Sequence, residues 1–205
     1  MLAILRTSLA LLTLAAIGLQ FSLHLNASHS ALNFFSYFTN LSNLFACFVL
    51  LVSASATRGM HSPWRDGLRF VSTANMLVVG IVFVALLRDA DLGGLLPWIN
   101  ILLHYVMPCA IVIDWLLDPP SSRLGLRHLA VSLVFPLLYL GYVVVRGTQM
   151  GWYPYPFLNP AIAGGSQAVA LHAVAIAVAF AIAGGILLLI GNRLLGRRLP
   201  SVLAQ

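Results

Sequence analysis

Two residues with complementary acid–base properties, Thr39 and His104, lie within separate apolar segments of the chain. A threonine hydroxyl is a weak nucleophile until a neighbouring base takes its proton. A histidine side chain can serve as that base, since its ordinary pKa is about 6.5. Such a pair can transfer an acyl group from an ester to the threonine oxygen and then to water. This chemistry requires that the two segments bring the side chains within direct or one-water reach.

The composition of the chain predicts that these segments lie in a membrane. Of the 205 residues, 60% are hydrophobic and 8% are charged, whereas soluble domains carry about 25% charged residues. This amount of polar surface cannot cover a water-soluble globule. The solvent around the protein must therefore be lipid. The length suits one compact domain that includes the whole chain, residues 1–205.

Six stretches are long and apolar enough to span a bilayer, which takes about 20 residues. Backbone groups must pair internally in hydrocarbon, so each span is a helix or a barrel strand. The stretches lack the alternating polarity of barrel strands, and we expect an all-α bundle of transmembrane helices. They cover residues 2–23, 34–55, 70–87, 97–117, 129–145 and 167–190.

The first stretch has an alternative interpretation as a signal peptide with Arg6 in its charged region. The apolar part of a signal peptide is about 7–15 residues long. This stretch is longer, so we expect it to remain as a span.

The positions of the arginines predict the orientation. Nine of the 11 fall on one side of the predicted spans, and that side should face the cytoplasm together with both termini. The protein is then a multi-pass protein of the plasma or inner membrane. No basic helix or aromatic platform accompanies the charge, so we expect no binding of nucleic acid, and membrane lipids are the expected partners of this charge. The nine are Arg6, Arg58, Arg65, Arg69, Arg123, Arg127, Arg193, Arg197 and Arg198; Arg88 and Arg146 lie on the other side.

Polar residues from four predicted spans converge on one layer near the outer leaflet. At 1.5 Å per residue, Thr39 and His104 lie about 7.5 and 10 Å from the outer ends of their spans. Polar groups inside a membrane are candidates for function by default. The other members of the layer are Asn43, Asn100, Tyr139, Tyr142, Gln167 and His172.

Each of these residues also has a purely structural interpretation. A threonine can bond a carbonyl of its own helix, and a histidine or an asparagine such as Asn40 or Asn43 can join two helices. Tyrosines are common where a membrane meets water. The shared depth of several such groups favours function.

Pro108 and Asp114 lie beyond His104 in the same span. A proline four residues after His104 should kink the helix and free the carbonyl of His104, either for packing or beside a wet cavity. Asp114 is ten residues from His104, or about 15 Å along a helix, which is too far for an orienting hydrogen bond. We expect Asp114 either to pair with an arginine of the inner side or to face a polar interface.

The loop after the fifth span has the sequence WYPYPFLNP at residues 152–160. Its prolines stiffen it, and its aromatic side chains either anchor it at the interface or form a lid. We expect a cavity in the outer half of the bundle, bounded by the second, fourth, fifth and sixth spans and covered by residues 153–157.

Three short motifs together resemble a known family. They are FTNLSN at residues 38–43, LHYVMP at residues 103–108 followed by Asp114 and Trp115, and WYPYPFL at residues 152–158. They resemble the bacterial six-helix "Pr-six-Pr" membrane proteins, which are similar to the animal androgen-induced (FAR-17a-like) threonine hydrolases. Those enzymes cleave fatty acid esters of hydroxy fatty acids. The resemblance implies Thr39 as nucleophile, His104 as base, and no cofactor.

Seven further residues are candidates for binding the substrate or stabilising the oxyanion. The sequence does not choose among them, and it contains no metal-ligand cluster, P-loop or dinucleotide fingerprint. They are Asn43, Asn100, Tyr139, Tyr142, Tyr153, Tyr155 and His172.

Two other classes of function stay open. His104 and His172, at similar depths, could bind a haem or a quinone. The other class is a non-catalytic transporter or scaffold. Asp114 is the one acid deep within a predicted span, so the sequence offers little for a proton-coupled transport path.

Overall fold

The computed structural model describes residues 1–56, 62–91 and 93–202, with side chains described as far as residue 196. No residue in these ranges belongs to a β-strand. Arg58 and the side chains of Arg197 and Arg198, which enter the orientation argument, lie outside the described residues. The long elements are α1 (Leu2–Asn26), α3 (Phe38–Ser55), α4 (Pro63–Val82) with η1 (Phe83–Leu87), α5 (Pro97–Ile101) with η2 (Leu102–Val106) and α6 (Met107–Leu117), α7 (Leu126–Met150) and α9 (Ser166–Val202).

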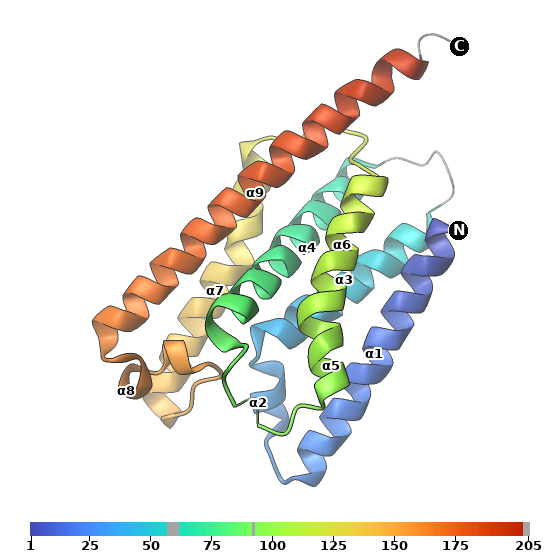
Figure 1. Ribbon diagram of the computed structural model, residues 1–205. Helices are drawn as coiled ribbons and strands as arrows, with labels where there is room; N and C mark the ends of the chain where they lie inside the picture. Colours follow the sequence, from blue (N-terminus) through green and yellow to red (C-terminus); the bar gives the residue numbers. More distant parts are fainter. Residues whose placement is uncertain (57–61, 92, 203–205) are drawn as a thin grey trace.

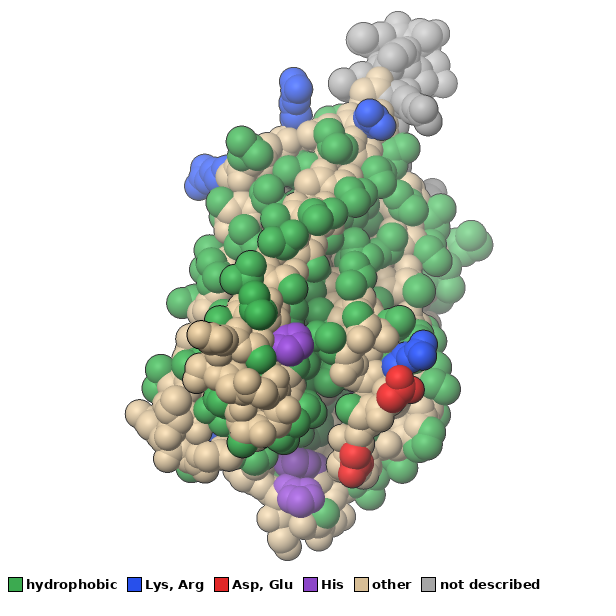
Figure 2. Space-filling model, turned by 60° about the vertical axis from the view of Figure 1, so that its left-hand side comes forward, with side chains coloured by type: hydrophobic (Ala, Val, Ile, Leu, Met, Phe, Trp, Pro, Cys, Tyr) green, Lys and Arg blue, Asp and Glu red, His purple; other side chains and the backbone are tan. Residues whose placement is uncertain are grey.

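These elements form six helices that are long and apolar enough to cross a membrane, in the part of the chain that is described. The all-α, multi-pass architecture is therefore confirmed. Figure 2 shows hydrophobic side chains over the middle of one face, with charged side chains toward its ends. Three short helices, α2 (Ala31–Phe35), η3 (Pro156–Leu158) and α8 (Pro160–Ala163), lie at one end of the bundle (Figure 1).

Helix α4 is at the centre of the bundle (Figure 1). It packs against α3, α6, α7 and α9, while α1 packs on the outside of α3. Its buried residues include the small side chains Ser72, Thr73 and Ala74, and small residues let membrane helices approach closely. The close packing of α3 and α6 against α4 brings the segments that carry Thr39 and His104 together.

The second span begins later than the sequence predicts, at Phe38 instead of residue 34. The Ser36 hydroxyl donates to the Leu32 carbonyl at 2.6 Å, α2 ends, and Tyr37 takes an extended conformation before α3 starts. The sequence FFSYF at residues 34–38 contains no proline, glycine or charged residue that would mark this break, so hydropathy does not reveal it. The break places Thr39 in the first turn of α3, nearer the helix end than its expected depth.

The region around Pro108 is a widened helical turn. Residues Leu102–Val106 form the π-helix η2, in which the Met107 amide bonds the Leu102 carbonyl, and such turns are frequent at functional sites. Gly80 of α4 permits a close approach there, since a Cβ at this position would lie 3.1 Å from the Pro108 Cβ and 3.7 Å from the His104 carbonyl oxygen. The predicted irregularity is therefore present and faces protein.

Charged side chains from three helices form a network at the opposite end of the bundle from α2 and α8. Asp114 accepts from Arg6 at 2.7 Å and from Arg69 at 3.0 Å, and Asp118 accepts from Arg6 at 2.8 Å. Both arginines are buried. The prediction that Asp114 pairs with an arginine of this side is confirmed.

Candidate active site

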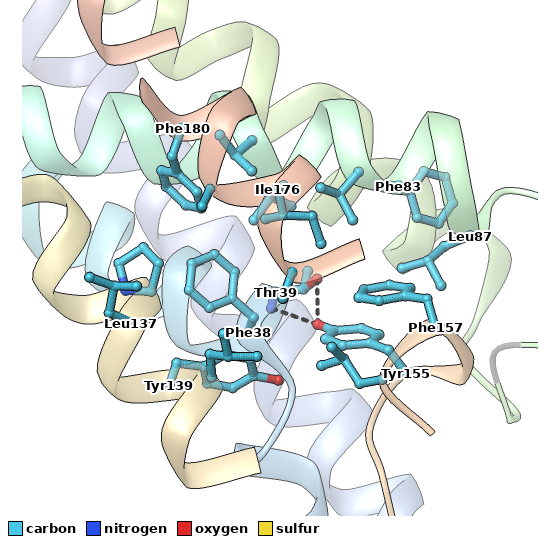
Figure 3. A pocket seen from close by; sticks show the side chains of 18 of the residues that line it. Phe38, Thr39, Phe83, Leu87, Leu137, Tyr139, Tyr155, Phe157, Ile176 and Phe180 are labelled. Carbon is cyan, nitrogen blue, oxygen red and sulfur yellow. Dashed lines mark hydrogen bonds between the residues drawn. The ribbon is translucent and has the colours of Figure 1, made fainter. Parts of the chain in front are cut away.

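Thr39 lies in the first turn of α3, where a backbone amide has no acceptor within its own helix. The Thr39 amide donates instead to the phenol oxygen of Tyr155 at 3.2 Å. The same phenol oxygen lies 3.4 Å from the Thr39 hydroxyl (Figure 3). Tyr155 is buried, and burial raises the pKa of its phenol above the ordinary value. The phenol therefore stays protonated at neutral pH and can donate.

His104 lies on the other side of the Thr39 hydroxyl. Its Nε2 atom is 3.2 Å from Thr39 Oγ1, and its Nδ1 atom is 3.2 Å from the Asn100 carbonyl oxygen. A carbonyl can only accept, so Nδ1 carries the proton and Nε2 offers its lone pair to the threonine. The expectation of direct or one-water reach is met by direct contact.

The His104 ring is held by a second contact. It stacks on the ring of Phe83, with centroids 4.0 Å apart and planes 20° apart. Phe83 begins the π-helix η1, so two widened turns on neighbouring helices face each other across this stack. Phe83 was missed by the sequence analysis, because nothing distinguishes it from the other aromatic residues in the spans.

Asn43 connects the two helices that carry Thr39 and His104. Its amide nitrogen donates to the Thr39 carbonyl at 2.9 Å and to the Leu103 carbonyl at 3.3 Å. Both amide protons are thereby used, so Asn43 positions the site and has no donor left for an oxyanion. Asn100 contributes its backbone carbonyl to His104, and its side chain is not recorded in contact with Thr39.

Tyr139 lines the same apolar space as Thr39 and, together with Tyr142, holds the break between α2 and α3. Tyr139 donates to the Ser36 carbonyl at 2.8 Å, and the Tyr142 hydroxyl is 2.7 Å from the Ser36 hydroxyl. Arg146, counted in the sequence only as an outer arginine, donates to the same hydroxyl at 3.3 Å. These residues therefore support the start of α3.

Tyr153 and His172 make no hydrogen bond to Thr39. The Tyr153 ring lies against Gly147 of α7, where a Cβ would overlap it. The His172 Nδ1 atom is 2.8 Å from the Ala168 carbonyl of its own helix, and the His172 ring lies against Phe157. Of the seven further candidates, Tyr155 and Asn43 contact Thr39.

An apolar cavity opens on one side of Thr39 (Figure 3). The space between its walls is about 780 Å³, part of it open to the surroundings. Its walls are almost wholly apolar and come from α3, α4 with η1, α7, the loop after α7, and α9. The lining residues include Thr39, Phe83, Leu87, Pro136, Leu137, Tyr155, Phe157, Ala173, Ile176, Ala177 and Phe180.

A polar vestibule opens on the other side of Thr39, and the space between its walls is about 1050 Å³, part of it open to the surroundings. Thr39, Leu87 and Tyr155 line both spaces, so the Thr39 hydroxyl lies at their boundary. The vestibule is lined by His104 and by polar side chains that include Gln20, His24, His29, Asn33, Asn40 and Asp91.

The predicted walls of the apolar cavity are correct in part. The second, fifth and sixth spans line it, as does the loop after α7. The prediction that the fourth span lines the apolar cavity is wrong. Leu103 and His104 of that span line the vestibule, and α4 with η1 forms the corresponding wall of the apolar cavity. The Phe83 ring, stacked on His104, stands between the fourth span and the apolar cavity. Tyr153 lines neither space, because its ring packs on Gly147.

Comparison with known families identifies a match over most of the chain. The model of the FAR-17a/AIG1-like proteins matches residues 9–189. The chain belongs to the FAR-17a/AIG1-like family. This match includes Thr39, His104 and the loop at residues 152–158. No curated protein and no solved structure matches the chain, so the chemistry of this FAR-17a/AIG1-like protein follows from the geometry around Thr39.

That geometry is suited to acyl transfer. A hydroxyl contacts an unprotonated ring nitrogen, and the ring is oriented by a third group, as in other activated nucleophiles. The start of α3 adds partial positive charge beside the hydroxyl. Within the described ranges, this FAR-17a/AIG1-like chain has no group of three or more His, Cys, Asp or Glu placed to hold a metal ion.

Proposed function

We propose that this protein is a membrane-embedded hydrolase of lipid esters, with Thr39 as nucleophile and His104 as base. The observation that carries the proposal is the position of the Thr39–His104 pair at the boundary between an apolar cavity and a polar vestibule. A lipid ester has the same division, since its acyl chain favours the apolar space and its reacting carbonyl needs polar groups and water.

The reaction would proceed in two steps. His104 Nε2 takes the hydroxyl proton as Thr39 Oγ1 attacks the ester carbonyl, and the resulting oxyanion is stabilised by the Tyr155 hydroxyl and the start of α3. The carbon–oxygen bond to the alcohol breaks, and His104 returns the proton to the leaving alcohol. A water molecule from the vestibule, deprotonated by His104, then attacks the acyl-threonine. The acid leaves and the Thr39 hydroxyl is restored.

The resemblance to the threonine hydrolases supports fatty acid esters of hydroxy fatty acids as the substrate class. The acyl chain would occupy the apolar cavity, and the alcohol part would face the vestibule. Leu137 of α7 lines the cavity and is also 57% exposed on the outside of the protein. A substrate dissolved in the bilayer could therefore reach Thr39 from the side, between α7 and α9.

Labelling with a lipid-like fluorophosphonate probe, together with hydrolysis of lipid esters, tests this function. Thr39→Ala should abolish both, because the attacking oxygen is lost, while Thr39→Ser should keep some activity. His104→Ala should lower the rate by roughly 10²–10⁴-fold. His172→Ala is the control and should leave hydrolysis intact. If Thr39→Ala labels and hydrolyses like the unchanged protein, the proposal is wrong.

The two alternative functions have less support from the geometry. Both ring nitrogens of His104 are engaged, and a nitrogen of His172 bonds its own helix. Binding of a haem iron by the pair would break the Thr39–His104 contact, and a Soret band in the purified protein would favour it. A transporter or scaffold would bind lipids without consuming esters, which the hydrolysis assay distinguishes.

We also propose that both termini face the cytoplasm and that the vestibule opens on the outer side of the plasma or inner membrane. The arginine distribution supports this orientation. A reporter fused to the C-terminus should be active only in its cytoplasmic form. An external C-terminus would reverse the orientation.

A further inference from the structure

The apolar cavity ends at a floor made by three side chains from three helices. Val78 of α4, Leu133 of α7 and Phe180 of α9 are the lining residues farthest along their helices from the end that carries Thr39. Val78 and Phe180 are each 2% exposed, and Leu133 packs against them. Figure 3 shows Phe180 across the cavity from Phe157. These three side chains are called the cavity floor.

The helices are packed too closely beyond the floor to leave room for a longer chain. Gly184 lies one turn past Phe180 on α9, and a Cβ there would overlap the Leu129 side chain of α7 and lie 3.7 Å from the Phe70 ring of α4. The absence of a side chain at Gly184 allows this contact. The floor is thus backed by three helices in direct contact.

The walls above the floor have a defined length. On α9 the lining residues Ala173, Ile176, Ala177 and Phe180 form one helical face, and seven residues separate the first from the last, or about 10 Å. On α4 and η1, nine residues separate Val78 from Leu87, or about 13 Å. An extended chain of roughly 8–11 carbons fits this depth, since each bond of about 1.5 Å advances a zigzag chain by somewhat less than its length.

We infer that the cavity floor sets the longest acyl chain that the enzyme accepts at full effectiveness. The inference rests on the proposed function, in which the acyl chain occupies the apolar cavity. Each carbon buried above the floor adds apolar contact and should raise kcat/KM about fourfold. Carbons beyond the floor find no room inside the cavity, and any that leave through the opening beside Leu137 gain no buried contact, so the increase should stop at roughly 8–11 carbons.

Hydrolysis of a series of esters that share one alcohol and differ in saturated acyl length tests the inference. Phe180→Ala opens the floor and should move the limit to chains longer by roughly two to four carbons, provided that the neighbouring side chains do not collapse into the space left by the ring. Ala177→Phe places a ring halfway along the wall and should move the limit to shorter chains. Ala175→Phe is the matched control, because Ala175 is exposed on the same helix and does not line the cavity.

A binding measurement separates this inference from the proposed function. Saturated free fatty acids of increasing length are added to the Thr39→Ala protein in detergent, and thermal unfolding is followed. Stabilisation should rise with length up to the same limit, and Phe180→Ala and Ala177→Phe should shift it in opposite directions. This result supports the inference that the cavity floor limits chain length, even if no ester is hydrolysed. If stabilisation shows no limit of chain length, or if neither variant moves that limit, the inference is overturned. If Phe180→Ala does not fold, the result for Ala177→Phe decides.

Discussion

The Tyr155 phenol oxygen accepts a hydrogen bond from the Thr39 amide at 3.2 Å and lies 3.4 Å from the Thr39 hydroxyl. The loop after α7 is thereby tied to the first turn of α3. One side chain satisfies a helix-end amide and places an O–H beside the proposed nucleophile. Because the amide is the donor in the shorter bond, the phenol proton is left for the hydroxyl or for an oxyanion.

Tyr155→Phe is expected to lower kcat by about 10²–10³-fold, the usual loss when one oxyanion donor is removed. The ring should stay in place, because it stacks on Phe157 with centroids 5.2 Å apart. Since burial raises the pKa of the Tyr155 phenol, the rate should not fall through ionisation of this group at neutral pH. Steady-state kinetics check this, with Tyr153→Phe as control, because Tyr153 lies on the same loop and lines neither the cavity nor the vestibule. An unchanged kcat in Tyr155→Phe would remove Tyr155 from the mechanism.

Asn43→Ala is expected to reduce kcat more than it changes KM. The substitution leaves the Thr39 and Leu103 carbonyls without the donor that joins their helices, and the hydroxyl and the imidazole lose their fixed separation. A buried unpaired carbonyl also destabilises the fold by about 1–3 kcal/mol. Kinetics per folded molecule and thermal unfolding in detergent measure the two effects.

Asn192→Ala is the matched control for Asn43. The Asn192 side chain also joins two segments, through two hydrogen bonds to the backbone of Leu124, but it lies near the other end of the bundle. It should lower stability and leave kcat unchanged. If both variants lose kcat alike, Asn43 acts through general stability and has no positioning role.

The six spans and the depth of the site follow from the sequence for a physical reason. Length and apolar character define a span, and a fixed rise of 1.5 Å per residue converts residue number into depth. This is why Thr39 and His104 could be placed in one layer. The same counting separated Asp114 from His104 and assigned it to the inner arginines.

Backbone geometry limited the prediction of the site. No proline, glycine or charged residue marks the break at Ser36 and Tyr37, so the start of α3 was misplaced. The role of Asn100 belongs to its carbonyl, which every residue has, and its side chain suggested a different one. The wall formed by Phe83 depends on a π-turn and on packing between α4 and its neighbours, neither of which the residue types encode.

Asp114→Ala is expected to destabilise the protein by about 3–5 kcal/mol, because two buried arginines lose a shared carboxylate. Arg6 and Arg69 would keep their contacts to Asp118 and to backbone carbonyls, and Arg69 would keep its contact with the Trp115 ring. Thermal unfolding in detergent should show the loss, while probe labelling per folded molecule should be unchanged. Asp89→Ala provides the comparison: its carboxylate is 85% exposed and pairs with an exposed Arg88, and such pairs contribute little. Equal stability of the two variants would refute a structural role for the network.

Gly147→Ala is expected to lower activity by displacing the loop that carries Tyr155. A methyl group at Gly147 would overlap the Tyr153 ring, and the stiff segment at residues 152–158 would have to move as a unit. Gly141→Ala on the same helix meets nothing within 4 Å and should be neutral or stabilising by about 0.5–1 kcal/mol, since alanine favours a helix over glycine. Adding Tyr153→Ala to Gly147→Ala removes the overlap and should restore hydrolysis, with a large coupling in the double-mutant cycle. Additive effects of the two substitutions would show that the Gly147–Tyr153 contact does not position the loop.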